Sequence, residues 1–135
     1  KSPAFKLIFD TGNPVFNYRR IGFPPYALQS SWEFYRNVRE FITYVHVKDG
    51  TAIPREDGKR PDCDYCWPGE GSGDVRAIVI DLHKNGYDGG FSMEPHMGSV
   101  FHDTDNNSAD DKRKEIYIEY GRRFEKLIEE LSPVK

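Results

Sequence analysis

The stretch GFSMEPH, residues 90–96, ends a short apolar run with a carboxylate. A short apolar run that is bounded by glycine and proline is typical of a core strand in a parallel sheet. Glu94 follows this expected strand directly, at the point where the strand should stop. A carboxylate beside a buried strand is costly unless it is paired or bound to a cation. Glu94 is therefore the first candidate functional residue.

Two other stretches end in the same manner. KLIFDTGN, residues 6–13, is an apolar strand closed by Asp10, and TYVHVKDG, residues 43–50, is a β-branched and aromatic strand that carries His46. Neighbouring strands lie about 5 Å apart in a sheet. If these strands are neighbours, the side chains of Asp10, His46 and Glu94 converge above one end of the sheet.

The periodicity of the apolar residues predicts three strand–helix units. Steps of three and four residues favour amphipathic helices, whereas short apolar runs favour buried strands. Strands that alternate with helices are expected to be parallel and joined by right-handed crossovers. The sequence predicts strands over 5–9, 43–47 and 90–93, and helices over 27–42, 73–86 and 110–131.

Three long loops, 11–26, 48–72 and 95–109, leave the carboxyl ends of the expected strands. This is the side on which α/β folds build their sites. Three units are too few for an eight-stranded barrel, which needs about 250 residues, so we expect an open sheet or the last part of a barrel. Because the chain opens on Lys1 rather than Met and would leave an apolar sheet edge, we expect self-association or a missing N-terminal part.

Composition narrows the possible partners. The 135 residues suit one domain, and 37% are apolar, which suits a packed core. The net charge of −3, with no basic block, argues against nucleic-acid binding. No apolar run reaches the roughly 18 residues of a membrane span, and no signal-peptide pattern is present. We therefore expect no membrane partner and a cytoplasmic location.

One imidazole and two carboxylates form a mixed nitrogen and oxygen donor set that suits Mn²⁺, Mg²⁺, Co²⁺ or Zn²⁺. Taken alone, Asp10 is equally consistent with a turn or helix cap. His46 alone is consistent with a partly buried structural histidine. The equivalent positions of Asp10, His46 and Glu94 at strand ends favour a shared metal ion.

The sequence CDYC contains the two cysteines of the chain, Cys63 and Cys66. Such a pair can be half of a zinc site or a redox motif. No second pair supplies further zinc ligands, and the two cysteines fall in a polar predicted loop. We therefore interpret them as two loop thiols or a disulfide.

Four motifs in a fixed order carry a family resemblance. They are FDTGNPV (9–15), YVHVKD (44–49), PGEGSGDV (68–75) and GYDGGFSMEPH (86–96). With them, nearly the whole chain resembles the C-terminal part of the sugar phosphate isomerase/epimerase family, whose members share a xylose isomerase-like (β/α)8 barrel. The resemblance implies that residues 1–135 form three consecutive parallel βα units from the C-terminal part of a (β/α)8 TIM barrel.

The resemblance also implies a site. In this family one divalent cation is held by Glu, Asp, His and Glu at four successive strand ends, and the last three match Asp10, His46 and Glu94. The first glutamate would precede Lys6 and is not in this chain. Glu94 would also move protons, in the isomerisation or epimerisation of a sugar or sugar phosphate through a metal-stabilised enediolate.

Two further residues are candidates for substrate binding. Asn13 stands where several relatives carry a substrate-binding histidine, so it is expected to hydrogen-bond a sugar hydroxyl. Lys48 is expected to neutralise an oxyanion or meet a phosphate, and the alternative is a surface salt bridge with Asp49. Glu70 is interpreted either as a substrate contact or as the cap of the following helix.

Two other functions are consistent with such a barrel. One is a non-catalytic binding module that has kept the shape. The other is a zinc phosphodiesterase of the endonuclease IV type, which shares the scaffold but needs more histidines. It would require histidine at Asn13 and in the loop 48–72, which contains none, so the sequence disfavours it.

Overall fold

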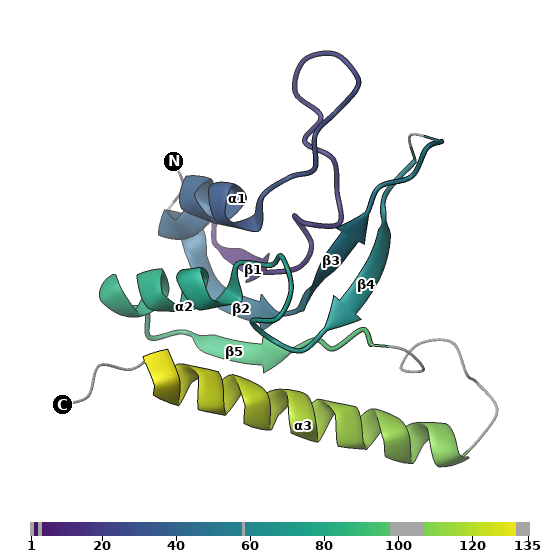
Figure 1. Cartoon of the computed structure of the whole chain (residues 1–135). Coiled ribbons are helices and arrows are strands. Elements are labelled where there is room, and N and C mark those ends of the chain that lie inside the picture. Colours follow the sequence, from purple (N-terminus) through teal and green to yellow (C-terminus); the bar gives the residue numbers. More distant parts are fainter. Residues whose placement is uncertain (1, 3, 58, 98–106, 132–135) are drawn as a thin grey trace.

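The computed structural model describes residues 2, 4–57, 59–97 and 107–131, so part of the predicted loop 95–109 lies outside the described residues. Figure 1 shows the helices and strands along the chain. In order they are β1 (Leu7–Asp10), α1 (Ser31–Val38), a short 3₁₀ helix η1 (Arg39–Phe41), β2 (Ile42–Val47), β3 (Asp49–Ile53), β4 (Asp62–Cys66), α2 (Val75–Lys84), β5 (Gly90–Met93) and α3 (Asn107–Leu131).

The strands β1, β2 and β5 form a parallel sheet in the order β1–β2–β5. Asp10 lies opposite His46, and His46 lies opposite Ser92. Helices alternate with these strands along the chain. The prediction of three parallel strand–helix units is therefore confirmed, and the predicted strand boundaries differ from those of the structure by at most two residues.

The two faces of this sheet differ because successive side chains of a strand point to opposite sides. On one face Phe9, Val45 and Val47 are buried in the main core together with apolar residues of α1, α2 and α3. On the other face, Ile8 is 63% exposed and lies opposite Tyr44, which is also exposed. The helices therefore cover one face and leave the other uncovered.

The helix predicted over 27–42 is wrong at both ends, since α1 covers only Ser31–Val38. Residues before it pair with an earlier segment instead, because Gln29 N donates to Asn17 O over 3.0 Å. Ser30 then caps the helix, and its side chain accepts a hydrogen bond from Glu33 N at 3.1 Å. Tertiary pairing and a cap thus shorten the helix.

The other two predicted helices are present with shifted boundaries. The helix α2 buries Val75, Ile78, Val79 and Leu82, and Gly86 follows it with a φ of 71°, a left-handed conformation that suits a helix end. The helix α3 begins at Asn107 rather than 110. Tyr120, Phe124 and Leu127 of α3 are buried, whereas Tyr117 is exposed.

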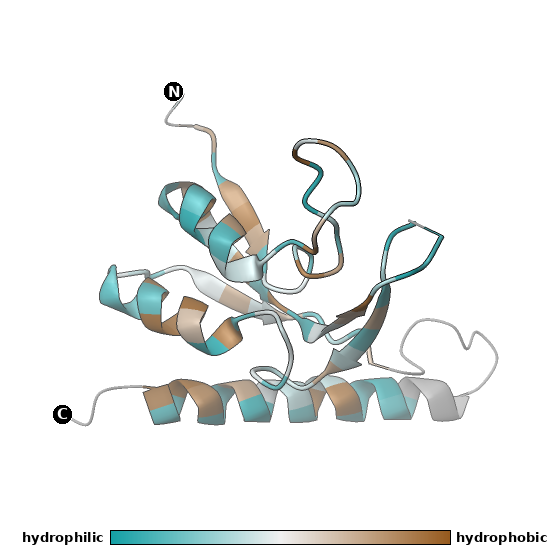
Figure 2. Cartoon of the chain, turned by 45° about the horizontal axis from the view of Figure 1, so that its top comes forward, coloured by the Kyte–Doolittle hydropathy of each residue, from teal (hydrophilic) through white to brown (hydrophobic). Residues whose placement is uncertain are grey.

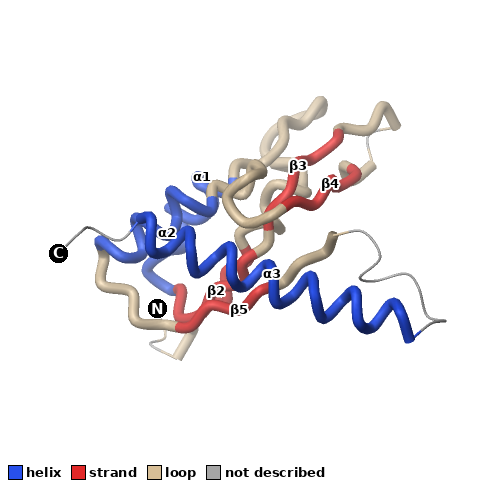
Figure 3. The backbone as a smooth tube through the Cα atoms, turned by 60° about the horizontal axis from the view of Figure 1, so that its bottom comes forward, coloured by secondary structure: helices blue, strands red, loops and turns tan. Residues whose placement is uncertain are grey.

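The predicted loop 48–72 is also wrong, because it contains an antiparallel hairpin of β3 and β4. Its strands carry many polar residues, so they lack the apolar run that signals a buried strand. A small cluster of Val15, Phe16 and Ala52 packs beneath it. Figure 2 shows that the tip of the β3–β4 hairpin is hydrophilic, whereas β1 is hydrophobic. Figure 3 shows that the hairpin projects beyond the ends of β2 and β5.

The cysteines consequently lie in a strand rather than in a loop. Cys63 and Cys66 both belong to β4, and both are free thiols. Their spacing of three places them on opposite faces of the strand, so the expectation of a disulfide between them is wrong. Among the described helices, none is both long enough and apolar enough to cross a membrane.

Candidate metal centre

Asp10, His46 and Glu94 converge at the carboxyl end of the parallel sheet. Asp10 ends β1, His46 lies in β2, and Glu94 follows β5. Glu94 is two residues past Ser92, the register partner of His46, so the alternation of side chains places all three on the uncovered face. One ligand atom from each residue lies within 4.8 Å of those from the other two.

Backbone hydrogen bonds continue past the strand ends and fix where these side chains begin. Thr11 N donates to His46 O, and Glu94 N donates to Val47 O, each over 3.0 Å. The buried hydroxyl of Thr11 donates to Lys48 O at 2.6 Å and accepts from Lys48 N at 3.0 Å. The ends of β1, β2 and β5 are therefore held together as one unit.

Asp10 has two separate tasks, one for each oxygen. Its Oδ1 accepts hydrogen bonds from Gly12 N and Asn13 N, both at 2.9 Å. This is the turn cap that the sequence allowed as an alternative. Its Oδ2 is not used by the turn and lies 2.9 Å from Lys48 Nζ. Asp10 thus caps the turn and still offers one oxygen to a ligand.

Lys48 lies inside the cluster. Its Nζ is 2.9 Å from Asp10 Oδ2, 3.1 Å from Glu94 Oε2 and 3.2 Å from Asn13 Oδ1. The side chain is 5% exposed. The alternative of a surface salt bridge with Asp49 is therefore wrong.

Burial and charge act differently on the two carboxyl groups. Burial raises the pKa of Asp10, and the neighbouring Glu94 carboxyl raises it further, while Lys48 opposes both effects. For Glu94, partial burial favours the protonated form, but its contacts with Asp10 and Lys48 outweigh this and hold its pKa below the ordinary value. Glu94 is thus the carboxyl group of the pair that favours the ionised form.

Two histidines flank Glu94. His46 Nδ1 lies 3.3 Å from Glu94 Oε2, and His96 Nε2 lies 3.2 Å from Glu94 Oε1. The ring of His96 stacks on Tyr65 of β4, with the ring centroids 5.3 Å apart. His96 was not among the site residues predicted from the sequence. The signal in the sequence was its position two residues after Glu94. In an extended chain, side chains two residues apart point to the same side.

Asn13 lines a hollow beside the site. This hollow of about 380 Å³ runs along β1 and includes Ile8, Asp10 and Phe34 among its lining residues. Since Asp10 lines the same hollow, a small molecule bound there would lie next to the carboxylates. The position of Asn13 suits its expected role as a substrate ligand.

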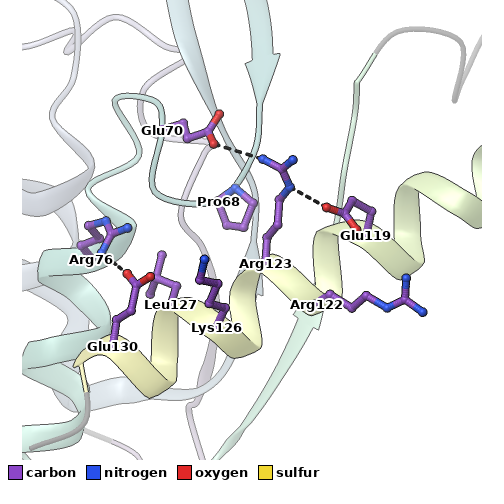
Figure 4. A pocket seen from close by; sticks show the side chains of 9 residues that line it. All are labelled: Pro68, Glu70, Arg76, Glu119, Arg122, Arg123, Lys126, Leu127 and Glu130. Carbon is purple, nitrogen blue, oxygen red and sulfur yellow. Dashed lines mark hydrogen bonds and ion pairs between the residues drawn. The ribbon is translucent and has the colours of Figure 1, made fainter.

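A second groove, of about 430 Å³, is lined by none of the candidate site residues. Figure 4 shows that oppositely charged side chains bridge it: Glu70 pairs with Arg123 at 3.3 Å, and Arg76 pairs with Glu130 at 3.2 Å. The expectation that Glu70 caps the following helix is wrong, because Asp74 precedes α2 and Glu70 reaches α3. One pair connects α3 to the loop before α2, and the other connects α3 to α2 itself.

The donor set fits a small divalent cation. The atoms Asp10 Oδ2 and Glu94 Oε2 are shielded from solvent, yet they make no well-formed hydrogen bond among the described residues. Such buried oxygens need a cationic neighbour, and the ammonium of Lys48 is that neighbour in this structure. Two carboxylates and one imidazole are ligands that Mg²⁺, Mn²⁺, Co²⁺ and Zn²⁺ accept.

Two solved structures have a similar fold. One is a xylose isomerase domain protein from Planctomyces limnophilus, with a TM-score of 0.52 and 21% identity over 91% of this chain and 37% of that chain. The other is a xylose isomerase-like TIM barrel protein from Mycobacterium smegmatis in complex with magnesium, with a TM-score of 0.51 and 18% identity over 91% and 34% of the two chains. This chain has the fold of part of a xylose isomerase-like TIM barrel.

The chain spans about a third of the length of these two proteins. In a TIM barrel, the face of the sheet away from the helices is the interior, and sites form at the carboxyl ends of the strands. The uncovered face with Asp10, His46 and Glu94 therefore corresponds to the interior of the xylose isomerase-like barrel. No protein family and no curated protein matches the sequence itself.

Proposed function

We propose that this chain carries part of the active site of a divalent-metal-dependent sugar or sugar phosphate isomerase or epimerase. The observation that carries the proposal is the convergence of Asp10, His46 and Glu94 at the carboxyl end of a parallel sheet. The xylose isomerase-like fold supports it, and one protein of this fold was solved with magnesium.

Asp10, His46 and Glu94 would hold the cation, which would be Mn²⁺, Mg²⁺, Co²⁺ or Zn²⁺. When bound, the cation would supply Lewis-acid stabilisation of the oxyanion of an enediolate. The protein orients these three side chains, because hydrogen bonds between the strand ends fix the backbone from which each of them projects.

Glu94 is the proposed catalytic acid/base group. Its lowered pKa favours the carboxylate, which is the form that accepts a proton from a substrate carbon. His46 and His96 each approach a different oxygen of Glu94, so the carboxylate has a defined orientation. In an isomerisation Glu94 would return the proton to the neighbouring carbon. In an epimerisation a second acid, the glutamate that this chain does not contain, would protonate the opposite face of the same carbon.

Asn13 and Lys48 are the proposed substrate-binding residues. Asn13 lines the hollow along β1 and would hydrogen-bond a sugar hydroxyl. Lys48 would neutralise an oxyanion or a phosphate, since its ammonium lies beside the catalytic carboxylate. The expected partner is thus a small sugar or sugar phosphate.

Residues 1–135 are proposed to be the C-terminal part of a larger barrel. The chain covers 37% and 34% of the two structures that share its fold, so activity is proposed for the protein that completes the barrel. The absence of nucleic-acid and membrane partners and the cytoplasmic location stay predictions from the sequence.

The proposal is tested by binding of Mn²⁺ measured by calorimetry. Glu94→Gln keeps the shape of the side chain but removes a charged ligand, so we expect affinity to fall by at least about tenfold. Glu70→Gln is the matched control, because Glu70 is exposed and pairs with Arg123. Equal affinities of the chain and Glu94→Gln would contradict the metal site.

The chemical step is tested by exchange in D₂O. In the protein that completes the barrel, we expect NMR to show Mn²⁺-dependent incorporation of deuterium at the carbon next to the carbonyl of a ketose. Glu94→Gln should abolish this exchange. Mn²⁺ binding without exchange across a panel of ketoses and their phosphates would favour the alternative of a binding module.

A further inference from the structure

The ammonium group of Lys48 occupies the space between the two carboxylates. It approaches Asp10 Oδ2 to 2.9 Å and Glu94 Oε2 to 3.1 Å. Both oxygens are buried, and neither makes a well-formed hydrogen bond among the described residues.

The structure holds Lys48 firmly in this place. Thr11 hydrogen-bonds both the N–H and the carbonyl of Lys48, so the start of the side chain is fixed. The stem packs over Gly12, where an added Cβ would lie only 2.8 Å from Lys48 Cγ. The side chain therefore reaches the carboxylates along a path that a larger residue at position 12 would block.

The charges in the cluster explain why a cation is needed there. Asp10 and Glu94 are neighbouring carboxyl groups, and two carboxylates at close range repel one another. A lysine ammonium has three N–H groups, and three acceptor oxygens, from Asp10, Glu94 and Asn13, lie within 3.2 Å of Lys48 Nζ. Lys48 thus places one positive charge against both carboxyl groups.

We propose that Lys48 is a built-in cation that holds Asp10 and Glu94 together in the metal-free protein, and that a divalent ion must displace its ammonium from these oxygens in order to bind. This inference rests on the proposed function. A metal ion lies about 2.0–2.3 Å from its oxygen ligands. If the Lys48 ammonium stayed beside the same two oxygens, it would lie close to the metal ion. The two positive charges would then repel one another strongly in a site of low dielectric.

Displacement also reconciles the two roles of Lys48. While the ammonium lies against oxygens of Asp10, Glu94 and Asn13, these oxygens compete with a substrate for it. Once the metal ion takes over the carboxylates, the ammonium is released beside the site. Lys48 therefore becomes a substrate ligand only in the metal-loaded protein.

The test compares Mn²⁺ affinity, by calorimetry, and the Tm of the metal-free protein. Lys48→Met keeps much of the stem and removes the charge. We expect it to bind Mn²⁺ at least about tenfold more tightly than the unchanged chain, which lies within the usual range of coupling between two sites. We also expect it to have a lower metal-free Tm, because two carboxylates lose their counter-ion.

Lys59→Met is the matched control, because it removes the same charge from a side chain that is 76% exposed. It should leave both quantities unchanged. Equal or weaker Mn²⁺ binding by Lys48→Met would overturn the inference and leave the proposed metal site standing. If neither the protein that completes the barrel nor its Lys48→Met variant binds Mn²⁺, both the inference and the proposed function are wrong.

A second measurement serves if Lys48→Met does not fold. In a crystal structure of the unchanged protein with Mn²⁺, the inference requires that Lys48 Nζ has left at least one of Asp10 Oδ2 and Glu94 Oε2. An ammonium that keeps both contacts beside a bound Mn²⁺ ion would overturn the inference.

Discussion

At the scale of single residues, Asp49 organises the loop that follows the hairpin. Its carboxylate is 1% exposed, and it accepts hydrogen bonds from Gly69 N and Gly73 N, both at 2.8 Å, and from Gly71 N at 3.1 Å. An added Cβ at Gly73 would lie 2.8 Å from Asp49 Oδ1, and one at Gly71 would be closer still. Gly71 and Gly73 are therefore explained by their close approach to one buried carboxylate.

Asp49→Asn should lower the free energy of unfolding by about 2–3 kcal/mol. An amide turns one acceptor oxygen into a donor, so backbone N–H groups of the loop lose their partner in a buried place. Urea denaturation measures the change. Asp64→Asn is the control, because Asp64 is exposed in β4, and it should cost less than about 0.5 kcal/mol. Equal effects of the two variants would contradict the role of Asp49.

Cys66 should react slowly with alkylating reagents at neutral pH. Burial raises the pKa of its thiol to about 12, and nearby acidic groups, Asp49 first, add to the effect. Because the thiolate is the reactive form, the rate should keep rising with pH until about 12. Iodoacetamide labelling of Cys63→Ser, followed by mass spectrometry, isolates this thiol. A rate that levels off near pH 9 would show that Cys66 titrates as an ordinary cysteine.

At the scale of elements, the hairpin and α3 place glycine in opposite surroundings. In β3, a Cβ on Gly50 would lie 2.6 Å from the backbone oxygen of Asp64 and 2.9 Å from the ring of Phe16. Phe16 is fully buried and meets Tyr65 edge to face, with the ring centroids 5.0 Å apart. In α3, a Cβ on Gly121 would meet nothing within 4 Å.

The two glycines should therefore respond to alanine in opposite directions. Gly121→Ala should raise the free energy of unfolding by up to about 1 kcal/mol, since glycine is a poor helix former. Gly50→Ala should lower it by about 1–3 kcal/mol, because a well-packed site resists added volume. Thermal unfolding of both variants checks this. A stabilising Gly50→Ala would show that the hairpin is not packed on Phe16 as described.

At the scale of the whole molecule, the sheet has an uncovered face and an open edge at β1. In the described part of the chain, β1 pairs only with β2 within the sheet. Phe5 and Ile8 are both exposed there, and Phe34 lies beside Ile8 along the hollow. Apolar side chains on an open edge favour association with another strand or chain.

This chain alone should self-associate through the uncovered face. We expect sedimentation velocity to show a concentration-dependent mass, which Ile8→Lys shifts toward the monomer because a charge resists burial there. Ile21→Lys is the control, since Ile21 is 72% exposed in a different loop, and it should leave the mass unchanged. A monomer at every concentration would contradict this prediction.

Part of the fold follows from local patterns. The apolar runs before Asp10 and Glu94, and around His46, identified the strands of the parallel sheet, because burial on a sheet needs consecutive apolar residues. The hairpin of β3 and β4 was not predicted, since its strands are polar and lack apolar runs. Strand pairing rather than a large core holds it together. The ends of α1 were not predicted correctly either, because pairing of the chain before Ser30 competes with helix formation.

The sequence by itself determined where the three strands end and which residue types stand at these ends, since both depend on neighbours within a few positions. Only the tertiary structure decided that Lys48 lies between Asp10 and Glu94 rather than on the surface beside Asp49. Residues 10, 48 and 94 meet through strand register and the bonds of Thr11, and no local periodicity encodes such contacts. Charge interactions depend on distance and burial in three dimensions, and for this reason the electrostatics of the site came only with the fold.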